Sequence, residues 1–263
     1  MANTPMKNST DRHELILKKL QDNGRVSIDR LAEVTGVSGV TIRKDLKILE
    51  DKSLLFRTRG GASMNNPYTV ERPIHEKEFI HETEKEQIAK AALSLIGGND
   101  SVIIGSGTTT FALARALKPT RRMTVITPAV KVTLELSDRP NLEVLQLGGL
   151  IRPNSSSVAG AQAEGLLDEI SSGLLFLGAD GIDLDFGMSI TNLAEASLNK
   201  KMIDSAQVVA ILADSTKFGR RGIGKVCDFD QVHYIVTDSG IPSRLISKLE
   251  DKGVKVIVAP ATA

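Results

Sequence analysis

The 263-residue sequence predicts an α/β protein of two domains, with a small helical head and a larger domain built on a mainly parallel β-sheet. At about 150 residues per domain, the length suggests two domains. From Asp100 onward, short apolar runs alternate with amphipathic stretches, which is typical of a parallel sheet covered by helices on both faces. Residues 1–63 hold twelve Lys or Arg and eight Asp or Glu, whereas the remainder holds 21 and 24. A basic head on a mildly acidic body favours a polyanionic partner.

The composition excludes several classes of protein. No apolar run approaches the roughly 18 residues needed to span a bilayer, and no apolar segment of a secretory signal opens the chain. The single cysteine, Cys227, cannot form an internal disulfide, and His75 and His81 do not share a helix face. Aromatic residues make up 3% and Trp is absent, so the stacking platforms of single-strand binders are missing. We therefore expect a cytoplasmic protein without metal, cofactor or membrane contact, and we expect any nucleic acid that it binds to be a duplex.

Three helices are predicted in the head, over 11–22, 27–35 and 38–52. Ser27 and Ser38 are favourable N-caps for the second and third helices. In the third helix Ile42, Leu46 and Leu49 form a buried stripe. Two helices joined by a short turn that contains Gly36 form a helix-turn-helix pattern.

The outer face of the third helix carries the side chains expected to read DNA. A major-groove reader needs donors for base edges, an apolar contact for thymine and cations for phosphates. An ordinary solvated helix face is the alternative reading of the same lysines. The residues expected to contact DNA from this helix are Ser38, Val40, Thr41, Arg43, Lys44 and Lys47.

A short basic hairpin is predicted over 54–61. Arg57 and Arg59 are two residues apart, so they lie on one face of a strand and can follow a phosphate backbone. A helix-turn-helix with a basic wing is more specific than either part alone. The sequence therefore predicts a winged helix-turn-helix.

The head resembles the N-terminal signature of DeoR-type transcriptional regulators. The resemblance rests on Arg12, Ile16, Leu20, Ser38, the run Thr41-Ile42-Arg43-Lys44-Asp45-Leu46 and the wing Arg57-Thr58-Arg59-Gly60-Gly61-Ala62. A His is common in the family where Arg59 stands. The resemblance implies binding to operator DNA, with repression the commoner outcome, and repeated half-sites imply a homo-oligomer, either a dimer or a tetramer.

We expect a DNA-binding domain over 1–62, a linker over 63–75 and an effector-binding domain over 76–263. Two prolines, Pro67 and Pro73, mark the linker region. One charged helix is predicted over 74–96, with Phe79, Ile88, Ala92 and Leu95 buried. Strands are predicted over 102–104, 124–126, 142–147, 174–177, 208–213, 233–237 and 254–258, and further helices over 111–117, 130–137, 162–170, 193–205 and 242–251.

Three loops at the carboxyl ends of the predicted strands carry polar groups, which is where such sheets bind ligands. The loop over 105–110 supplies Ser106, Gly107, Thr108 and Thr109 at a helix start, and backbone amides there suit a phosphate. Asp180, in the loop over 178–183, can accept hydrogen bonds from sugar hydroxyls. Lys217, in the loop over 214–219, can act as a point charge for phosphate. A helix cap, an Asp that holds a Gly turn and a solvated lysine are the structural alternatives.

These loops also resemble the DeoR effector domain, which shares its fold with ribose-5-phosphate isomerase. The matching blocks are Ser106-Gly107-Thr108-Thr109, Gly148-Gly149 with Arg152, Gly178-Ala179-Asp180-Gly181-Ile182 and Asp214-Ser215-Thr216-Lys217-Phe218-Gly219. The resemblance implies a ribose-5-phosphate-isomerase-like sheet and a phosphorylated sugar as effector, with Arg152 among its contacts. Gly105 stands where many members have Asp, and Pro128-Ala129 follow Thr127 where Asn is common.

A sugar-phosphate isomerase is the alternative function. Isomerisation needs a general base beside the carbon-bound proton. In the similar isomerase this base is a Glu on the helix after the Gly-Ala-Asp loop. Here that position falls at Lys200, Glu195 lies several residues earlier, and the glycine-rich catalytic loop is missing. We therefore expect a regulator of a carbohydrate-utilisation operon that responds to a phosphorylated sugar, and not an enzyme.

Overall fold

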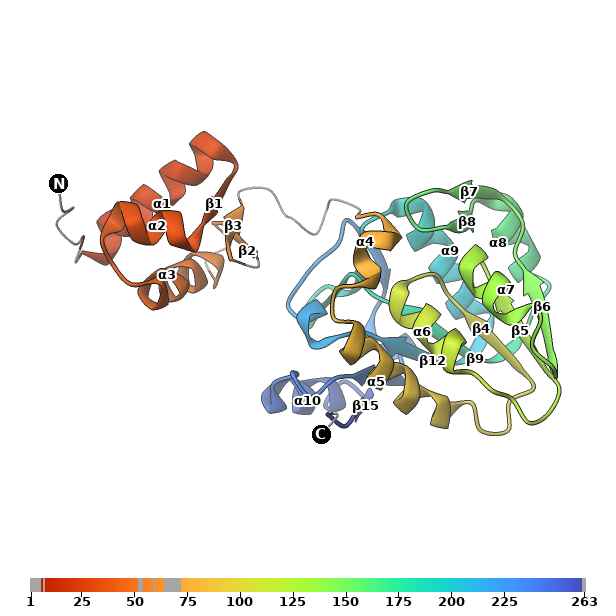
Figure 1. The fold of residues 1–263 in the computed structure, drawn as a ribbon. Coiled ribbons are helices and arrows are strands. Elements are labelled where there is room, and N and C mark those ends of the chain that lie inside the picture. The colour runs from red at the N-terminus through yellow and green to blue at the C-terminus, as the bar shows by residue number, and fades with distance from the viewer. Residues whose placement is uncertain (1–5, 7, 52–53, 59, 64–71, 262–263) are drawn as a thin grey trace. The chain divides into compact units, whose positions relative to one another are not determined.

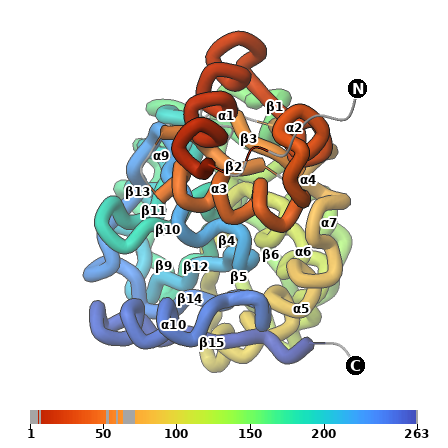
Figure 2. The backbone as a smooth tube through the Cα atoms, turned by 90° about the vertical axis from the view of Figure 1, so that its left-hand side faces the viewer, coloured from red at the N-terminus to blue at the C-terminus, as the bar shows by residue number. Residues whose placement is uncertain are grey.

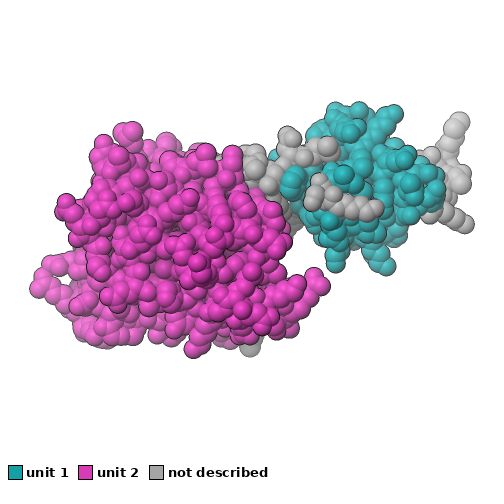
Figure 3. All heavy atoms as spheres, turned by 180° about the vertical axis from the view of Figure 1, so that it is seen from behind, with its two compact units in different colours: residues 1–70 teal, residues 71–263 magenta. Residues whose placement is uncertain are grey.

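The computed structural model describes residues 6, 8–51, 54–58, 60–63 and 72–261. The chain divides into two compact units, residues 1–70 and residues 71–263 (Figures 1 and 3). The predicted domain boundaries stay a prediction, because 64–71 of the expected linker lie outside the described residues. Ser63 belongs to a strand of the first unit and Ile74 begins a helix of the second.

The first unit is a winged helix-turn-helix. Its elements are α1 (Ser9–Asn23), β1 (Arg25–Ser27), α2 (Ile28–Thr35), α3 (Gly39–Asp51), β2 (Phe56–Thr58) and β3 (Gly61–Ser63). The three predicted helices and the hairpin are confirmed. The strand β1 pairs with hairpin strand β3, which gives an antiparallel sheet of order β1-β3-β2. A Cβ on Gly61 would lie 2.0 Å from the carbonyl oxygen of Val26, so this close pairing requires glycine. Ile16, Leu20, Leu31, Ile42, Leu46, Leu49 and Leu55 form the core.

The second unit is built on a seven-stranded parallel sheet of order β15-β14-β12-β9-β4-β5-β6. The strands are β4 (Ser101–Ile104), β5 (Met123–Thr127), β6 (Leu142–Gln146), β9 (Ser172–Gly178), β12 (Ala206–Leu212), β14 (Tyr234–Thr237) and β15 (Lys255–Val258). All seven coincide with predicted strands. Central strands are apolar on both faces because helices cover both: Val102 and Ile104 pack on one side and Ile103 on the other.

Helices form a layer on each face of the sheet (Figures 1 and 2). One layer holds α5 (Glu82–Ala92), α6 (Thr108–Ala116) and α7 (Val130–Leu136), and the other holds α8 (Ala161–Leu167), α9 (Leu193–Asp204) and α10 (Ser243–Glu250). This arrangement confirms the predicted α/β class. None of the described helices is long and apolar enough to cross a lipid bilayer.

Five short antiparallel strands were absent from the prediction. β7 (Leu150–Arg152) pairs with β8 (Ser157–Ala159), and β11 (Gly187–Ile190) pairs with β10 (Gly181–Asp183) and β13 (Gly224–Cys227). Strands of three or four residues are too short to show a clear period. They carry the loops at the carboxyl edge of the large sheet.

The single helix predicted over 74–96 is wrong. The structure has α4 (Ile74–Glu78), then α5, then a 3₁₀ turn η1 (Leu93–Leu95), with His81 at φ 55° between the two helices. Phe79, predicted to be buried, is 79% exposed, whereas Ile88 and Ala92 are buried as predicted. Because no Gly or Pro lies between residues 74 and 96, the break has no local stop signal. The residues of α4 instead make long-range contacts: the Ile74 amide donates to the Asn154 carbonyl, and Lys77 pairs with Asp180.

Candidate nucleic-acid interface and effector site

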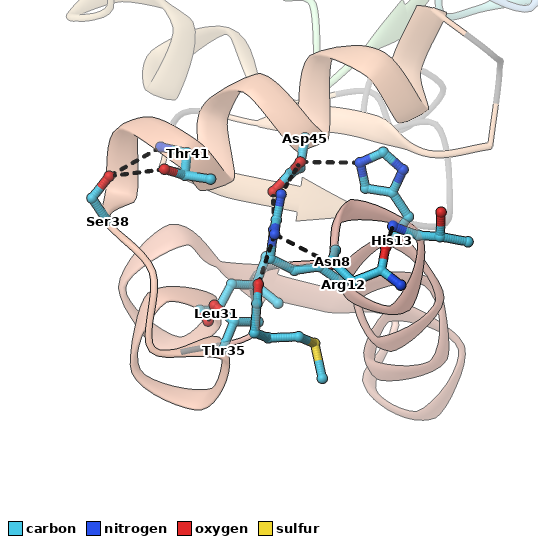
Figure 4. A network of polar contacts seen from close by, with 10 residues as sticks. Asn8, Arg12, His13, Leu31, Thr35, Ser38, Thr41 and Asp45 are labelled. Atoms are coloured by element: carbon cyan, nitrogen blue, oxygen red, sulfur yellow. Dashed lines mark hydrogen bonds and ion pairs between the residues drawn. The ribbon is translucent and has the colours of Figure 1, made fainter. Parts of the chain in front are cut away.

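The turn before α3 is fixed by the predicted cap. The hydroxyl of Ser38 accepts a hydrogen bond from the Thr41 amide at 3.3 Å and lies 3.0 Å from the Thr41 hydroxyl (Figure 4). Ser38 therefore begins the helix, and its hydroxyl is engaged in the cap.

The outer face of α3 is solvent-exposed and basic. Arg43, Lys44 and Lys47 are exposed, and no ion pair joins them to any residue that the structure describes. Val40 is 60% exposed, and Ile48, which the sequence reasoning missed, is 43% exposed on the same helix. These are the donors, cations and apolar groups that major-groove reading requires.

The wing places one of its two arginines within reach of α3. The amide of Arg57 donates to a carboxylate oxygen of Glu50 at 2.9 Å, and its guanidinium lies 3.7 Å from the other oxygen. Arg59 lies outside the described residues. Contact between Arg57 and phosphate would therefore compete with Glu50.

A buried ion pair joins α1 to α3 (Figure 4). The guanidinium of Arg12 donates from Nε and Nη2 to the two carboxylate oxygens of Asp45, at 2.6 and 2.9 Å, and His13 Nε2 lies 3.0 Å from the same carboxylate. Burial raises the pKa of Asp45, but the hydrogen bonds from Arg12 and His13 outweigh it, so the pKa lies below its usual value.

The second site lies at the carboxyl ends of β4, β9 and β12. Gly105 follows β4, and its amide donates to the carbonyl of Phe176 on β9 at 2.9 Å. A Cβ at position 105 would lie 2.6 Å from a methyl of Leu177, so a larger residue here would require the Leu177 side chain to move. Gly107, at φ 137°, turns the chain into α6.

The start of α6 offers unused donors. None of the backbone amides of 107–110 donates a hydrogen bond within the part of the chain that the structure describes. Thr108 is half-buried and Thr109 is buried beside them. A helix start with free amides attracts anions through both the donors and the helix dipole.

A carboxylate joins two of the predicted site residues. Glu195, in the first turn of α9, accepts from the hydroxyl of Ser106 at 2.5 Å and from Nη1 of Arg152 at 2.6 Å. The Asn192 side chain caps α9 by accepting from the amides of Ala194 and Glu195, which fixes the orientation of that turn. Lys200, which falls at the isomerase base position, is exposed. Sequence reasoning did not include Glu195 among the site residues, because only the fold brings α9, β7 and the Ser106 loop together.

Asp180 is held by three donors. One carboxylate oxygen accepts from the amide and the hydroxyl of Thr191, at 3.1 and 2.9 Å, and the other accepts from Lys77 Nζ at 3.0 Å. Burial raises the pKa of Asp180. The positive charges of Lys77 and Lys217 and these hydrogen bonds lower it by more, so the pKa lies below its usual value. Asp180 therefore stays ionised beside two ammonium groups.

Two lysines lie in this charged group. Lys217, in the 3₁₀ turn η2 (Ser215–Lys217), lies 4.0 Å from the Asp214 carboxylate. Burial lowers the pKa of Lys217 despite the attraction of Asp214 and Asp180. Lys85 on α5 is 6% exposed, and burial together with repulsion from Lys217 lowers its pKa to about 8. Lys77 and Lys85 were also missed, because nothing in the local sequence separates them from solvated lysines.

The predicted effector residues thus form two adjacent groups. Ser106 and Arg152 meet at Glu195, next to Thr108 and Thr109, and Asp180 and Lys217 interact electrostatically. A Cβ on Gly178 would lie 3.6 Å from the carbonyl oxygen of Ser106, so the two loops are neighbours. The described residues contain no group of three His, Cys, Asp or Glu that could hold a metal ion.

A winged helix-turn-helix with an exposed basic recognition helix, followed by an α/β domain with a polar site at its carboxyl edge, defines a two-domain DNA-binding regulator. Residues 12–68 match the DeoR-like helix-turn-helix domain, and residues 80–239 match the DeoR C terminal sensor domain. The chain belongs to the DeoR family of transcriptional regulators.

Relatives extend over nearly the whole chain. It is 36% identical to a protein assigned as the aga operon transcriptional repressor of Escherichia coli O157:H7, over 95% of this chain and 94% of the relative. It is 33% identical to the HTH-type transcriptional regulator YulB of Bacillus subtilis, over 95% of this chain and 96% of the relative. Among solved structures it is similar to ribose 5-phosphate isomerase A of Methanocaldococcus jannaschii, with TM-score 0.38 and 18% identity over 52% of this chain and 54% of that chain. Family and relatives identify a transcriptional regulator, not an enzyme.

Proposed function

We propose that this protein is a repressor of a carbohydrate-utilisation operon that binds duplex operator DNA and is released by a phosphorylated sugar. The aga operon name of one relative and the sensor-domain match support the carbohydrate link. We also propose the boundaries 1–62, 63–75 and 76–263 for its domains, a dimer or tetramer as the working form, and the cytoplasm, where operator DNA lies, as its location.

The observation that best supports a phosphorylated effector is that the backbone amides at the start of α6 donate no hydrogen bond to a described residue. The Ser106 hydroxyl and the Arg152 guanidinium, which pair with Glu195, are further donors that an anion can recruit from that carboxylate. Lys217 adds an ammonium group near Asp180, and Asp180 offers a carboxylate for sugar hydroxyls. A neutral sugar would leave the amides and ammonium groups without an anionic partner, so the phosphate is the part of the ligand that this site recognises.

On the DNA side, we propose that Arg43, Lys44 and Lys47 contact bases or phosphates, that Val40 and Thr41 contact thymine methyls or base edges, and that Arg57 and Arg59 contact the backbone. Ser38 acts on this interface through the helix cap, where its hydroxyl holds the Thr41 amide. The exposure of this face supports the assignment. Loss of a bidentate base contact costs about 1–3 kcal/mol at one position, whereas loss of a phosphate contact weakens binding to all sequences alike.

Calorimetry with matched pairs of sugars tests the effector proposal. Hexose 6-phosphates and pentose 5-phosphates are titrated into the protein beside the corresponding free sugars and inorganic phosphate. We expect at least one phosphosugar to bind much more tightly than its free sugar. Equal affinity within every pair would refute the proposal. The variant Arg152→Ala is expected to lose the preference, and Arg122→Ala, which removes an exposed arginine paired with Glu143, serves as the control.

A further inference from the structure

The five-residue helix α4 is the first described helix after residues 64–71, which join the two units in sequence. A helix of this length is not stable alone, so its conformation depends on what holds it. Its first residue, Ile74, is buried, and the Ile74 amide donates to the carbonyl of Asn154 at 2.7 Å. Asn154 lies in the turn between β7 and β8, two residues after Arg152. The first contact of α4 is therefore with an element of the effector site.

The second contact is the ion pair between Lys77 and Asp180. Lys77 Nζ lies 3.0 Å from Oδ1 of Asp180, and the two side chains are 29% and 20% exposed. The other carboxylate oxygen is already bonded to Thr191. A sugar hydroxyl that bonds to Oδ1 must therefore share that oxygen with Lys77 or displace it.

The C-terminal end of α4 is held by Lys85, a lysine next to the effector site. Lys85 Nζ donates to the carbonyl oxygens of Lys77 and Glu78, and the Lys85 charge lies close enough to Lys217 to be repelled by it. Glu78 pairs with Lys131 on α7. The other contacts described for α4 are made with Asn154, Asp180 and Lys85, which belong to the effector site or lie beside it.

We infer that Lys77 is an effector-site residue. When effector binds, the Lys77–Asp180 contact breaks, α4 is released from the contacts described above, and this change alters the affinity of the DNA-binding unit for operator. The inference rests on the proposed function for the identity of the ligand. A polyhydroxylated anion acts on both partners at once, because its hydroxyls compete for Asp180 while its phosphate attracts the ammonium of Lys77. Because α4 is the first described helix after residues 64–71, the inferred route from the effector site to the DNA-binding unit runs along the chain through α4.

The test begins without any effector. A duplex that the parent protein selects from a random DNA library serves as operator, and its affinity is measured for Lys77→Met, Asp180→Asn and the double variant. We expect each single variant to bind DNA more weakly by roughly 5- to 150-fold, the range of ordinary allosteric coupling. The double variant should lose no more than either single one, since both break one contact. Lys77→Arg should restore most of the affinity, and Lys90→Met, which removes an exposed lysine of α5, should bind like the parent.

A second measurement guards against loss of folding. Hydrogen exchange of the amides of α4 should speed up in Lys77→Met, while the central strands β4 and β9 keep the protection of the parent. Operator affinity equal to the parent in Lys77→Met, or additive losses in the double variant, would overturn the inference. If only the proposed function is wrong, the result differs: Lys77→Met would still weaken DNA binding, but no phosphosugar would bind the parent protein in calorimetry.

Discussion

Replacing Asp45 by Asn is expected to destabilise the DNA-binding unit by about 3 kcal/mol. Removing one partner of a buried ion pair typically costs about 3–5 kcal/mol, because the other charge stays buried without compensation. The side chains of Arg12 and Asp45 are only 7% and 4% exposed, so solvent screens this pair weakly. Arg12 Nη1 also donates to the carbonyls of Met6 and Asn8, at 2.7 and 3.3 Å, and these contacts survive the substitution. The expected cost therefore lies at the lower end of the range.

Hydrogen exchange measures this cost in the full chain, because amides of the head report its own opening equilibrium. The amides of Ile16, Leu20 and Ile42 should exchange about 140-fold faster in the variant, since about 1.4 kcal/mol corresponds to a factor of ten. Asp51→Asn removes an exposed carboxylate at the end of the same helix and is the matched control. Equal exchange in the two variants would show that the Arg12–Asp45 pair does not stabilise the head.

The same pair predicts a pH dependence of definite sign. The pKa of Asp45 is lower in the folded protein than the value of about 3.9 for an unfolded chain. The stabilisation is therefore complete above about pH 4 and is lost as the pH falls through the folded pKa. The parent head should lose this part of its stability in acid, and Asp45→Asn should not show that loss. An identical acid profile for both proteins would contradict the assignment.

Four further substitutions follow from the two sites. Lys44→Ala should weaken operator binding by about 1–3 kcal/mol if Lys44 reads a base, and gel shifts against point-mutated operators would show relaxed preference at one position. Arg57→Ala should weaken binding to all duplexes alike and reduce the slope of log affinity against log salt by about one. An unchanged slope would show that Arg57 makes no phosphate contact. Lys217→Ala should bind operator like the parent but respond less to phosphosugar, and a normal response would exclude Lys217 from the site. Glu195→Gln should weaken its contact with Arg152, and calorimetry should then detect altered phosphosugar affinity, whereas an unchanged affinity would place Glu195 outside the ligand's reach.

The sequence was most informative where local signals and burial agree. The central strands β4 and β9 of the large sheet are largely buried on both faces and are mainly apolar runs between loops. All seven strands of the sheet were predicted. The caps at Ser27 and Ser38 have the side chains that helix starts need. By contrast, β7, β8 and β10 are strands of only three residues, which is too short for alternation of apolar and polar residues to show.

The site was predictable only in part. Ser106 and Asp180 follow strands directly, so their place at the carboxyl edge follows from sheet topology. Glu195, Lys77 and Lys85 lie on helices whose local patterns resemble ordinary charged surface. Their roles come from long-range contacts, such as the 3.0 Å ion pair between Lys77 and Asp180 across 103 residues of sequence. The break between α4 and α5, with His81 at φ 55°, likewise has no local Gly or Pro signal.

The most direct test of the account is operator affinity measured with and without a phosphosugar that binds in calorimetry, with the sugar recovered and analysed afterwards. We predict that the effector weakens operator binding by roughly 5- to 150-fold and is recovered chemically unchanged. Operator affinity that does not respond to a bound phosphosugar, or conversion of that sugar at an enzyme-like rate of about 1 s⁻¹ or more, would contradict it.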